Sequence, residues 1–97
     1  MNIQKLMQEA QKMQREVSKN QDIINSTEFA GSSELCDIVI MGDHTVKQVN
    51  MKVDKLDEND MEILEDMIKI AYNEALGKLN KFSDEKMSKF NKMPGLF

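Results

Sequence analysis

The 97-residue chain contains few of the residues that build disulfide frameworks, metal sites and membrane spans. It has one cysteine and one histidine. A single cysteine cannot form an intramolecular disulfide, and one cysteine with one histidine supplies too few soft ligands for a zinc site. The longest uninterrupted apolar run, Ile38–Met41, is far shorter than the roughly 20 residues that cross a bilayer, and the N-terminal segment lacks the apolar core of a secretory signal. These absences predict a soluble intracellular protein.

The chain also lacks recognisable catalytic motifs. It has no glycine-rich phosphate loop, no serine–histidine–acid set and no isolated carboxylate pair. Cys36 falls on the apolar side of a predicted strand, where we expect it to be buried, and His44 falls beside Asp43 in a predicted turn. The acidic residues between Asp54 and Glu62 lack the spacing and internal glycine of a calcium loop and are interpreted as helix capping. We therefore expect a non-enzymatic protein without cofactor, metal or small-molecule substrate.

Composition and length indicate one small globular domain, residues 1–97. Apolar residues make up 40% of the chain and charged residues 31%, which is typical of folded proteins. A chain of this length hides roughly 60–65% of its unfolded surface, so pairing with a second copy would add useful buried area. Seventeen acidic against thirteen basic residues give a net charge of −4. Taken alone, this acidic excess argues against a nucleic-acid partner.

The N-terminal segment has the spacing of an amphipathic helix. Apolar residues recur three and four positions apart along it: Ile3, Leu6, Ala10, Met13 and Val17. This a/d seam covers about three heptads and predicts a helix over residues 2–21. The opposite side carries a polar stripe: Gln4, Gln8, Gln11 and Arg15. Lysines and glutamates run down the flank between the seam and the stripe.

The period of the apolar residues changes to two after the first helix. This alternation predicts three short strands over residues 26–30, 35–41 and 46–53. Gly31–Ser33 reads as a turn, and Gly42 lies in a hairpin between the last two strands. Three short antiparallel strands cannot stand alone, so one face of the sheet must lie on a helix.

A second, longer helix is predicted over residues 58–91. Its apolar positions again recur three and four residues apart: Met61, Leu64, Ile68, Ala71, Ala75, Leu79 and Phe82. A helix of about 30 residues is roughly 45 Å long, whereas a compact domain of this size is about 33 Å across. The end of the helix should therefore project or pack on another chain. The predicted fold class is α+β, in the order helix, three antiparallel strands, helix.

Charge is distributed unevenly along the sequence. Residues 1–20 hold four basic and two acidic side chains, residues 21–76 hold four basic and thirteen acidic, and residues 77–97 hold five basic and two acidic. Both helical ends are thus basic, whereas the acidic excess belongs to the middle. Exposed charges further apart than about 8–10 Å are largely screened from each other, so a polyanion near the ends would respond to their positive charge.

The basic residues of the two ends are candidate contacts to DNA phosphates: Lys5, Lys12, Arg15, Lys19, Lys78, Lys81, Lys86, Lys89 and Lys92. Because Arg15 is the single arginine, and few aromatic residues stand among the lysines, neither bidentate reading of several guanines nor stacking on single strands is favoured. Any DNA binding should be led by the phosphate backbone and weakly selective for sequence. The candidate core and dimer contacts are the seam residues: Leu6, Ala10, Met13, Val17, Leu79 and Phe82.

Four segments together resemble the YbaB/EbfC family of bacterial nucleoid-associated proteins. They are residues 6–14 (LMQEAQKMQ), 38–44 (IVIMGDH), 61–75 (MEILEDMIKIAYNEA) and 93–97 (MPGLF). The resemblance covers nearly the whole chain. It implies an α-β-β-β-α subunit that forms a tweezer-like homodimer and binds double-stranded DNA through projecting helices in the nucleoid of the bacterial cytoplasm. Two departures are a shorter, less glycine-rich segment at residues 31–34 and the use of lysine in place of arginine, which disfavours base-specific contacts.

Two other functions are compatible with parts of the pattern. A protein–protein adaptor would dock a partner on the apolar seams of its helices, with Leu6, Met13, Leu79 and Phe82 as anchors. Attachment to an anionic membrane is disfavoured, because the first helix pairs its lysines with Glu9 and Glu16 and has no tryptophan or phenylalanine on its apolar side.

Overall fold

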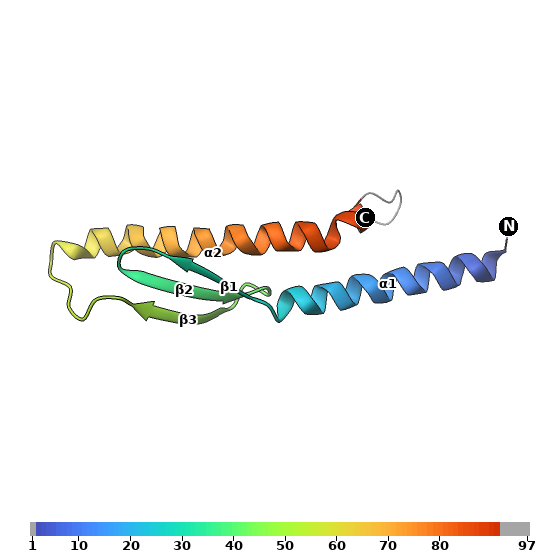
Figure 1. Ribbon diagram of the computed structural model, residues 1–97, viewed down its shortest axis with the longest axis horizontal. Coiled ribbons are helices and arrows are strands. Elements are labelled where there is room, and N and C mark those ends of the chain that lie inside the picture. The colour runs from blue at the N-terminus through green and yellow to red at the C-terminus, as the bar shows by residue number, and fades with distance from the viewer. Residues whose placement is uncertain (1, 92–97) are drawn as a thin grey trace.

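The computed structural model, which describes residues 2–91, has two long helices and a three-stranded antiparallel sheet. The elements follow one another along the chain: α1 Ile3–Asn25, β1 Glu28–Ser32, β2 Cys36–Met41, β3 Val46–Met51 and α2 Asp60–Asn91. The predicted α-β-β-β-α order is therefore confirmed. The strands lie in the order β1-β2-β3, and α2 runs along the sheet and past its end beside α1 (Figure 1).

The core lies between one face of the sheet and the middle of α2. Phe29, Ile38 and Ile40 point from β1 and β2 toward Ala71 and Ala75 of α2. Buried side chains alternate with exposed ones on β1 and with half-buried ones on β2, as the strand period of two requires. Cys36 and Leu79 complete this buried cluster, so the predicted burial of Cys36 is confirmed. α2 approaches β1 closely at Ala71 and Ala75, whose small side chains leave the two backbones in contact near Gly31.

Gly31 belongs to β1, so the predicted turn at Gly31–Ser33 is wrong. A Cβ atom at Gly31 would collide with the backbone of α2 at Ala71 and Ala75. Glycine is needed here for the close approach of helix and strand rather than for a chain reversal. The reversal comes after Ser32, where the backbone N–H of Ser33 donates to the carbonyl of Cys36 at 2.8 Å.

The helices differ in extent from the sequence prediction. α1 continues four residues beyond residue 21 because Ile24, which is 1% exposed, packs at the end of the sheet. Its start is fixed by Asn2, whose side chain accepts hydrogen bonds from the backbone N–H groups of Gln4 and Lys5. α2 begins at Asp60 rather than at residue 58, since Asp57 and Asn59 form a turn before it.

The molecule is a rod of 71 × 20 × 14 Å with a radius of gyration of 19.6 Å, against about 13 Å for a compact domain of 100 residues. The sheet occupies one end, and the start of α1 and the end of α2 lie toward the other (Figure 1). α2 projects past the end of the sheet, as predicted (Figure 1). Its last turns contact α1 of the same chain through Asn20 and Glu16. Within residues 2–91 no helix has the length and apolar character to cross a membrane.

Candidate nucleic-acid interface

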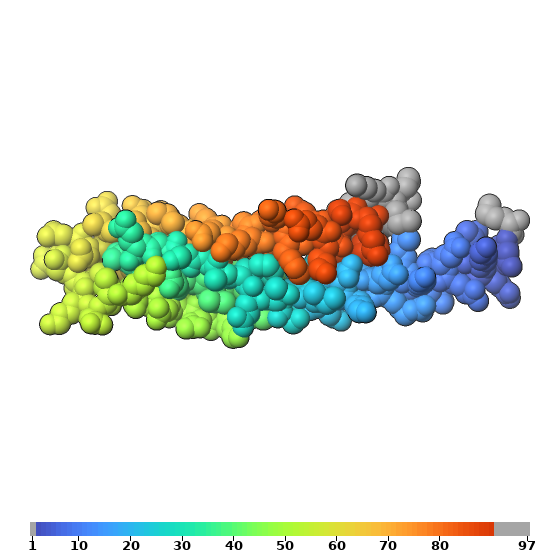
Figure 2. Space-filling model, in the orientation of Figure 1, coloured from blue at the N-terminus to red at the C-terminus, as the bar shows by residue number. Residues whose placement is uncertain are grey.

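The N-terminal half of α1 is a projecting helix. Every side chain from Ile3 to Lys12 is exposed, and Figure 2 shows this segment, in blue, extending beyond the rest of the described chain. Ile3 and Met7 are 71% and 57% exposed. Leu6 and Ala10 of the predicted seam are therefore uncovered in the single chain, whereas Met13 and Val17 are half-buried. We call residues 3–15 the arm of α1.

The second half of α1 is joined to the end of α2. The side-chain amide of Asn20 donates to the backbone carbonyl of Lys86 at 3.2 Å, and Lys89 pairs with Glu16 at 3.4 Å between Nζ and Oε2. Phe90 is 1% exposed beside this contact region of α2. The exposed ion pair adds little stability by itself, but the contacts fix which side of α1 faces α2.

The basic side chains near the arm point into solvent. Lys5, Lys12, Arg15 and Lys19 of α1 and Lys81 of α2 are exposed, and none of their side chains has a hydrogen bond or ion pair to another residue within 2–91. Lys86 lies 5.5 Å from the ring centroid of Phe82, and Lys89 lies 4.9 Å from that of Phe90. The rings hold these two ammonium groups beside α2 by cation–π attraction. Lys92 lies outside the described residues.

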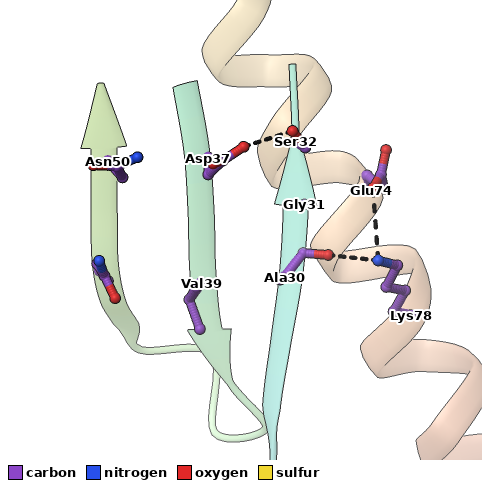
Figure 3. A pocket seen from close by; sticks show the side chains of 9 residues that line it. Ala30, Gly31, Ser32, Asp37, Val39, Asn50, Glu74 and Lys78 are labelled. Atoms are coloured by element: carbon purple, nitrogen blue, oxygen red, sulfur yellow. Dashed lines mark hydrogen bonds and ion pairs between the residues drawn. The ribbon is translucent and has the colours of Figure 1, made fainter. Parts of the chain in front are cut away.

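Lys78 differs from the other candidate lysines because it serves the sheet. Its ammonium donates to the carbonyl of Ala30 at 2.8 Å and pairs with Glu74 at 3.6 Å (Figure 3). Ala30 lies in β1, an edge strand of the sheet, and Glu74 lies one turn before Lys78 on α2. The structure therefore places Lys78 at the sheet edge, apart from the lysines of the arm, with one hydrogen bond and one ion pair already in place.

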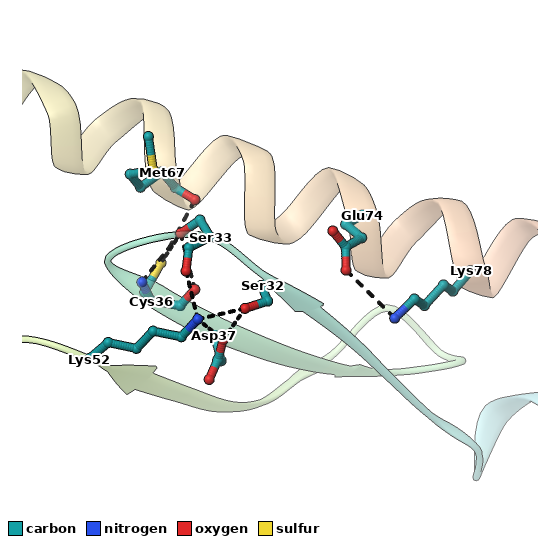
Figure 4. Close-up of polar contacts among 8 residues, drawn as sticks. All are labelled: Ser32, Ser33, Cys36, Asp37, Lys52, Met67, Glu74 and Lys78. Atoms are coloured by element: carbon teal, nitrogen blue, oxygen red, sulfur yellow. Dashed lines mark hydrogen bonds and ion pairs between the residues drawn. The ribbon is translucent and has the colours of Figure 1, made fainter.

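The outer face of the sheet carries a shallow polar hollow of about 310 Å³. Asp37 in this hollow already has two partners: Ser32 Oγ donates to Asp37 Oδ1 at 2.5 Å, and Lys52 Nζ, outside the hollow, lies 3.1 Å from the same oxygen (Figure 4). The hydrogen bond from Ser32, followed by that from Lys52, lowers the pKa of Asp37 below its ordinary value. A negative carboxylate with satisfied partners offers no site to a phosphate.

Positive and negative charge lie at opposite ends of the rod. Residues 54–66, at the start of α2, hold seven acidic side chains and one lysine, and they occupy the end of the molecule remote from the arm (Figure 1). The long dimension of 71 Å is many times the screening length of about 8 Å at physiological ionic strength. A polyanion at the arm would thus feel the local basic charge and not the acidic end.

The sequence gives no signal for one contact of this region and a weak signal for one buried residue. Glu16 and Lys89 are 73 positions apart, and nothing in their separate helical patterns indicates that they meet. The burial of Phe90 has a weak signal, since it follows the half-buried Phe82 by eight residues and extends the apolar stripe by about two turns.

The fold and charge distribution define a class of protein: a helix–sheet–helix rod whose exposed chemistry is positive charge on a projecting helical arm. The chain belongs to the YbaB/EbfC DNA-binding family, whose family model matches residues 1–93.

Curated relatives cover nearly the whole chain. A nucleoid-associated protein of Lactococcus lactis subsp. cremoris (strain MG1363) is 38% identical over 94 residues, which is 95% of each chain. A nucleoid-associated protein of Enterococcus faecalis is 37% identical over 97 residues, covering 97% of this chain and 93% of the relative. One from Ruminiclostridium cellulolyticum is 36% identical over 102 residues, covering 99% and 89%.

Proposed function

We propose that the protein binds double-stranded DNA in the bacterial nucleoid, as a homodimer, through the basic residues of its helical arms. The observation that carries this proposal is the segregation of charge: exposed, unpaired basic residues on the arm of α1, with the acidic residues at the far end of the rod. Membership of a DNA-binding family and relatives named nucleoid-associated proteins support the same partner and location.

The contacts would be made chiefly to phosphates. Lys5, Lys12 and Lys19 lie on one flank of α1, where their separation of seven residues repeats about every 10 Å along the helix. Each phosphate neutralised by a lysine releases condensed counterions, which favours binding at low salt regardless of base sequence. Low sequence selectivity follows, because phosphate contacts position a protein without identifying the bases.

An uncovered apolar face supports the dimer. Val46, Val49 and Met51 of β3 are opposite the buried β2 residues in the sheet register, with Val49 paired to Ile38, yet they are 40–54% exposed because α2 packs on β1 and β2. Met61 and Ile68 of α2 are exposed as well. A second copy laid on this face would bury apolar side chains and cover the unpaired edge of β3.

Paired lysine substitutions test the DNA contacts. Lys5→Ala with Lys12→Ala removes two arm lysines, and Lys55→Ala with Lys69→Ala removes two exposed lysines of the acidic end as a matched control. Affinity for duplexes of several sequences is measured by fluorescence anisotropy. The arm variant should bind all duplexes about equally more weakly, with a shallower dependence on salt, while the control variant binds like the native protein. Equal binding by both variants would refute the assignment.

The dimer is tested by light scattering at micromolar concentration. We expect twice the chain mass of 11.2 kDa. Val49→Asp should reduce this to the monomer mass, since a carboxylate on the apolar face would be buried unpaired on association. Gln48→Asp adds the same charge to the neighbouring exposed position of β3 and should leave the dimer intact. A monomeric native protein would contradict the dimer proposal.

A further inference from the structure

The polar stripe of α1, residues Gln4, Gln8, Gln11 and Arg15, lies on the side of the helix away from α2. Asn20 and Glu16 make the contacts to α2, and Ile24 is buried on nearly the same side. At 100° per residue the stripe is roughly opposite this side. All four stripe side chains are exposed, and none has a hydrogen bond or ion pair to another residue in the described part of the chain.

The stripe matches the dimensions of a DNA groove. From Gln4 to Arg15 the helix rises about 17 Å, which corresponds to about five base pairs at 3.4 Å each. An α-helix with its side chains is about 10–12 Å across and enters a major groove about 12 Å wide. The arm projects beyond the sheet and α2 (Figure 1). Neither element covers the side of the arm that carries the stripe, so a duplex can reach it.

The chemistry of the stripe differs from that of the lysine flank. A glutamine amide both donates and accepts, and it forms paired hydrogen bonds with the N6 and N7 atoms of adenine, while arginine pairs with O6 and N7 of guanine. Lys5, Lys12 and Lys19 run beside the stripe on one flank. When the stripe faces the base edges on the floor of the groove, the lysines on its flank lie near the phosphates of one groove wall. The positions of polar and positively charged side chains on the helix therefore match those of bases and phosphates in a duplex.

We propose that the arm of α1 enters the DNA major groove and that its stripe contacts base edges, with adenine favoured beneath the glutamines and guanine beneath Arg15. This inference rests on the proposed DNA binding and adds a modest base preference to contacts otherwise made to phosphates. The lysines supply most of the affinity, and the stripe sets which face of the helix meets the bases.

The test removes one acceptor atom from the groove without changing base pairing. A mixed-sequence duplex is compared with the same duplex containing 7-deazaadenine, which lacks the N7 acceptor. We expect the native protein to bind the substituted duplex about two- to tenfold more weakly, as the loss of a hydrogen bond predicts. The variant that combines Gln4→Ala, Gln8→Ala and Gln11→Ala should bind both duplexes equally, because its adenine contacts are already lost. Alanine is the best helix former, and circular dichroism checks that the helix content is unchanged.

A control variant and the alternative outcomes separate this inference from DNA binding itself. Gln14 is an exposed glutamine of α1 outside the stripe, so Gln14→Ala should keep the native response to 7-deazaadenine. Equal native affinity for both duplexes would overturn the base contacts while leaving phosphate-led binding in place. Equal losses by the native protein and the stripe variant would trace the effect to DNA shape and would also overturn the inference. Absence of binding to either duplex at low salt would refute the proposed function together with it.

Discussion

At the residue scale, Gly31 and Gly77 differ in whether the fold has room for a side chain. Gly31 lies where β1 meets the backbone of α2, and an added Cβ has no room, whereas a Cβ at Gly77 meets nothing within 4 Å. Gly77 lies inside a helix, where glycine is weakly unfavourable. The close helix–strand contact thus depends on Gly31 and gains nothing from Gly77.

The two glycines therefore give a matched pair of substitutions. Gly31→Ala should lower the free energy of unfolding by about 1–3 kcal/mol, because strand and helix must separate to accept the methyl group. Gly77→Ala should raise it by about 0.5–1 kcal/mol through better helix propensity. Urea unfolding at one protein concentration measures both. A Gly31→Ala protein as stable as the native one would contradict the described packing of β1 on α2.

Individual residues were predictable where a local rule applied to them. Cys36 could be placed in the core because it alternates with Asp37. Lys78 could not be placed, since its partner Ala30 is 48 positions away and its helical spacing matched that of the solvent-facing lysines. Whether a lysine pairs with protein or faces solvent depends on tertiary contacts that its own segment does not encode.

At the element scale, α1 combines a supported half with an unsupported one. Isolated helices of fewer than about 12–15 residues are marginal in water, and residues 3–12 have no covering element within the described chain. By contrast, Ala71–Leu79 of α2 lie over the sheet. The arm should open locally far more often than the middle of α2.

Amide hydrogen exchange tests this difference. In the protein without DNA, residues 3–12 should exchange much faster than residues 71–79, and adding a duplex should slow the arm while changing the core little. Protection of residues 3–12 equal to that of the core without DNA would contradict an open arm. It would mean that the apolar seam is covered, either by a second copy or by another protein. Cover by another protein is what the adaptor interpretation requires.

The order of the elements was more predictable than their ends. The change of apolar period from three and four to two marks the transition from helix to strand around residue 26. The end of α1 shifted because polar Asn20 and Gln21 break the seam in sequence, although Ile24 anchors one further turn in space. Gly31 was assigned to a turn because glycine permits both a turn and a close backbone approach, and the sequence contains no sign of α2 lying over it.

At the scale of the whole molecule, the net charge of −4 conceals a basic end and an acidic end. The rod separates them by tens of ångströms, and screening keeps them independent. The count of charges by region predicted that the helical segments are basic and the middle of the chain is acidic. The structure turns this division into two ends of a rod, because the basic parts of α1 and α2 lie side by side (Figure 1). The pairing of Lys89 with Glu16 reduces the free positive charge there in a way that no regional count predicts.

The central claim is that the basic arm binds DNA mainly through phosphates. It is tested most directly by the affinity for one duplex measured across salt concentrations. We predict a steep linear fall of log affinity with log salt between about 50 and 200 mM, similar for duplexes of unrelated sequence. An affinity that stays constant over this range would contradict the account.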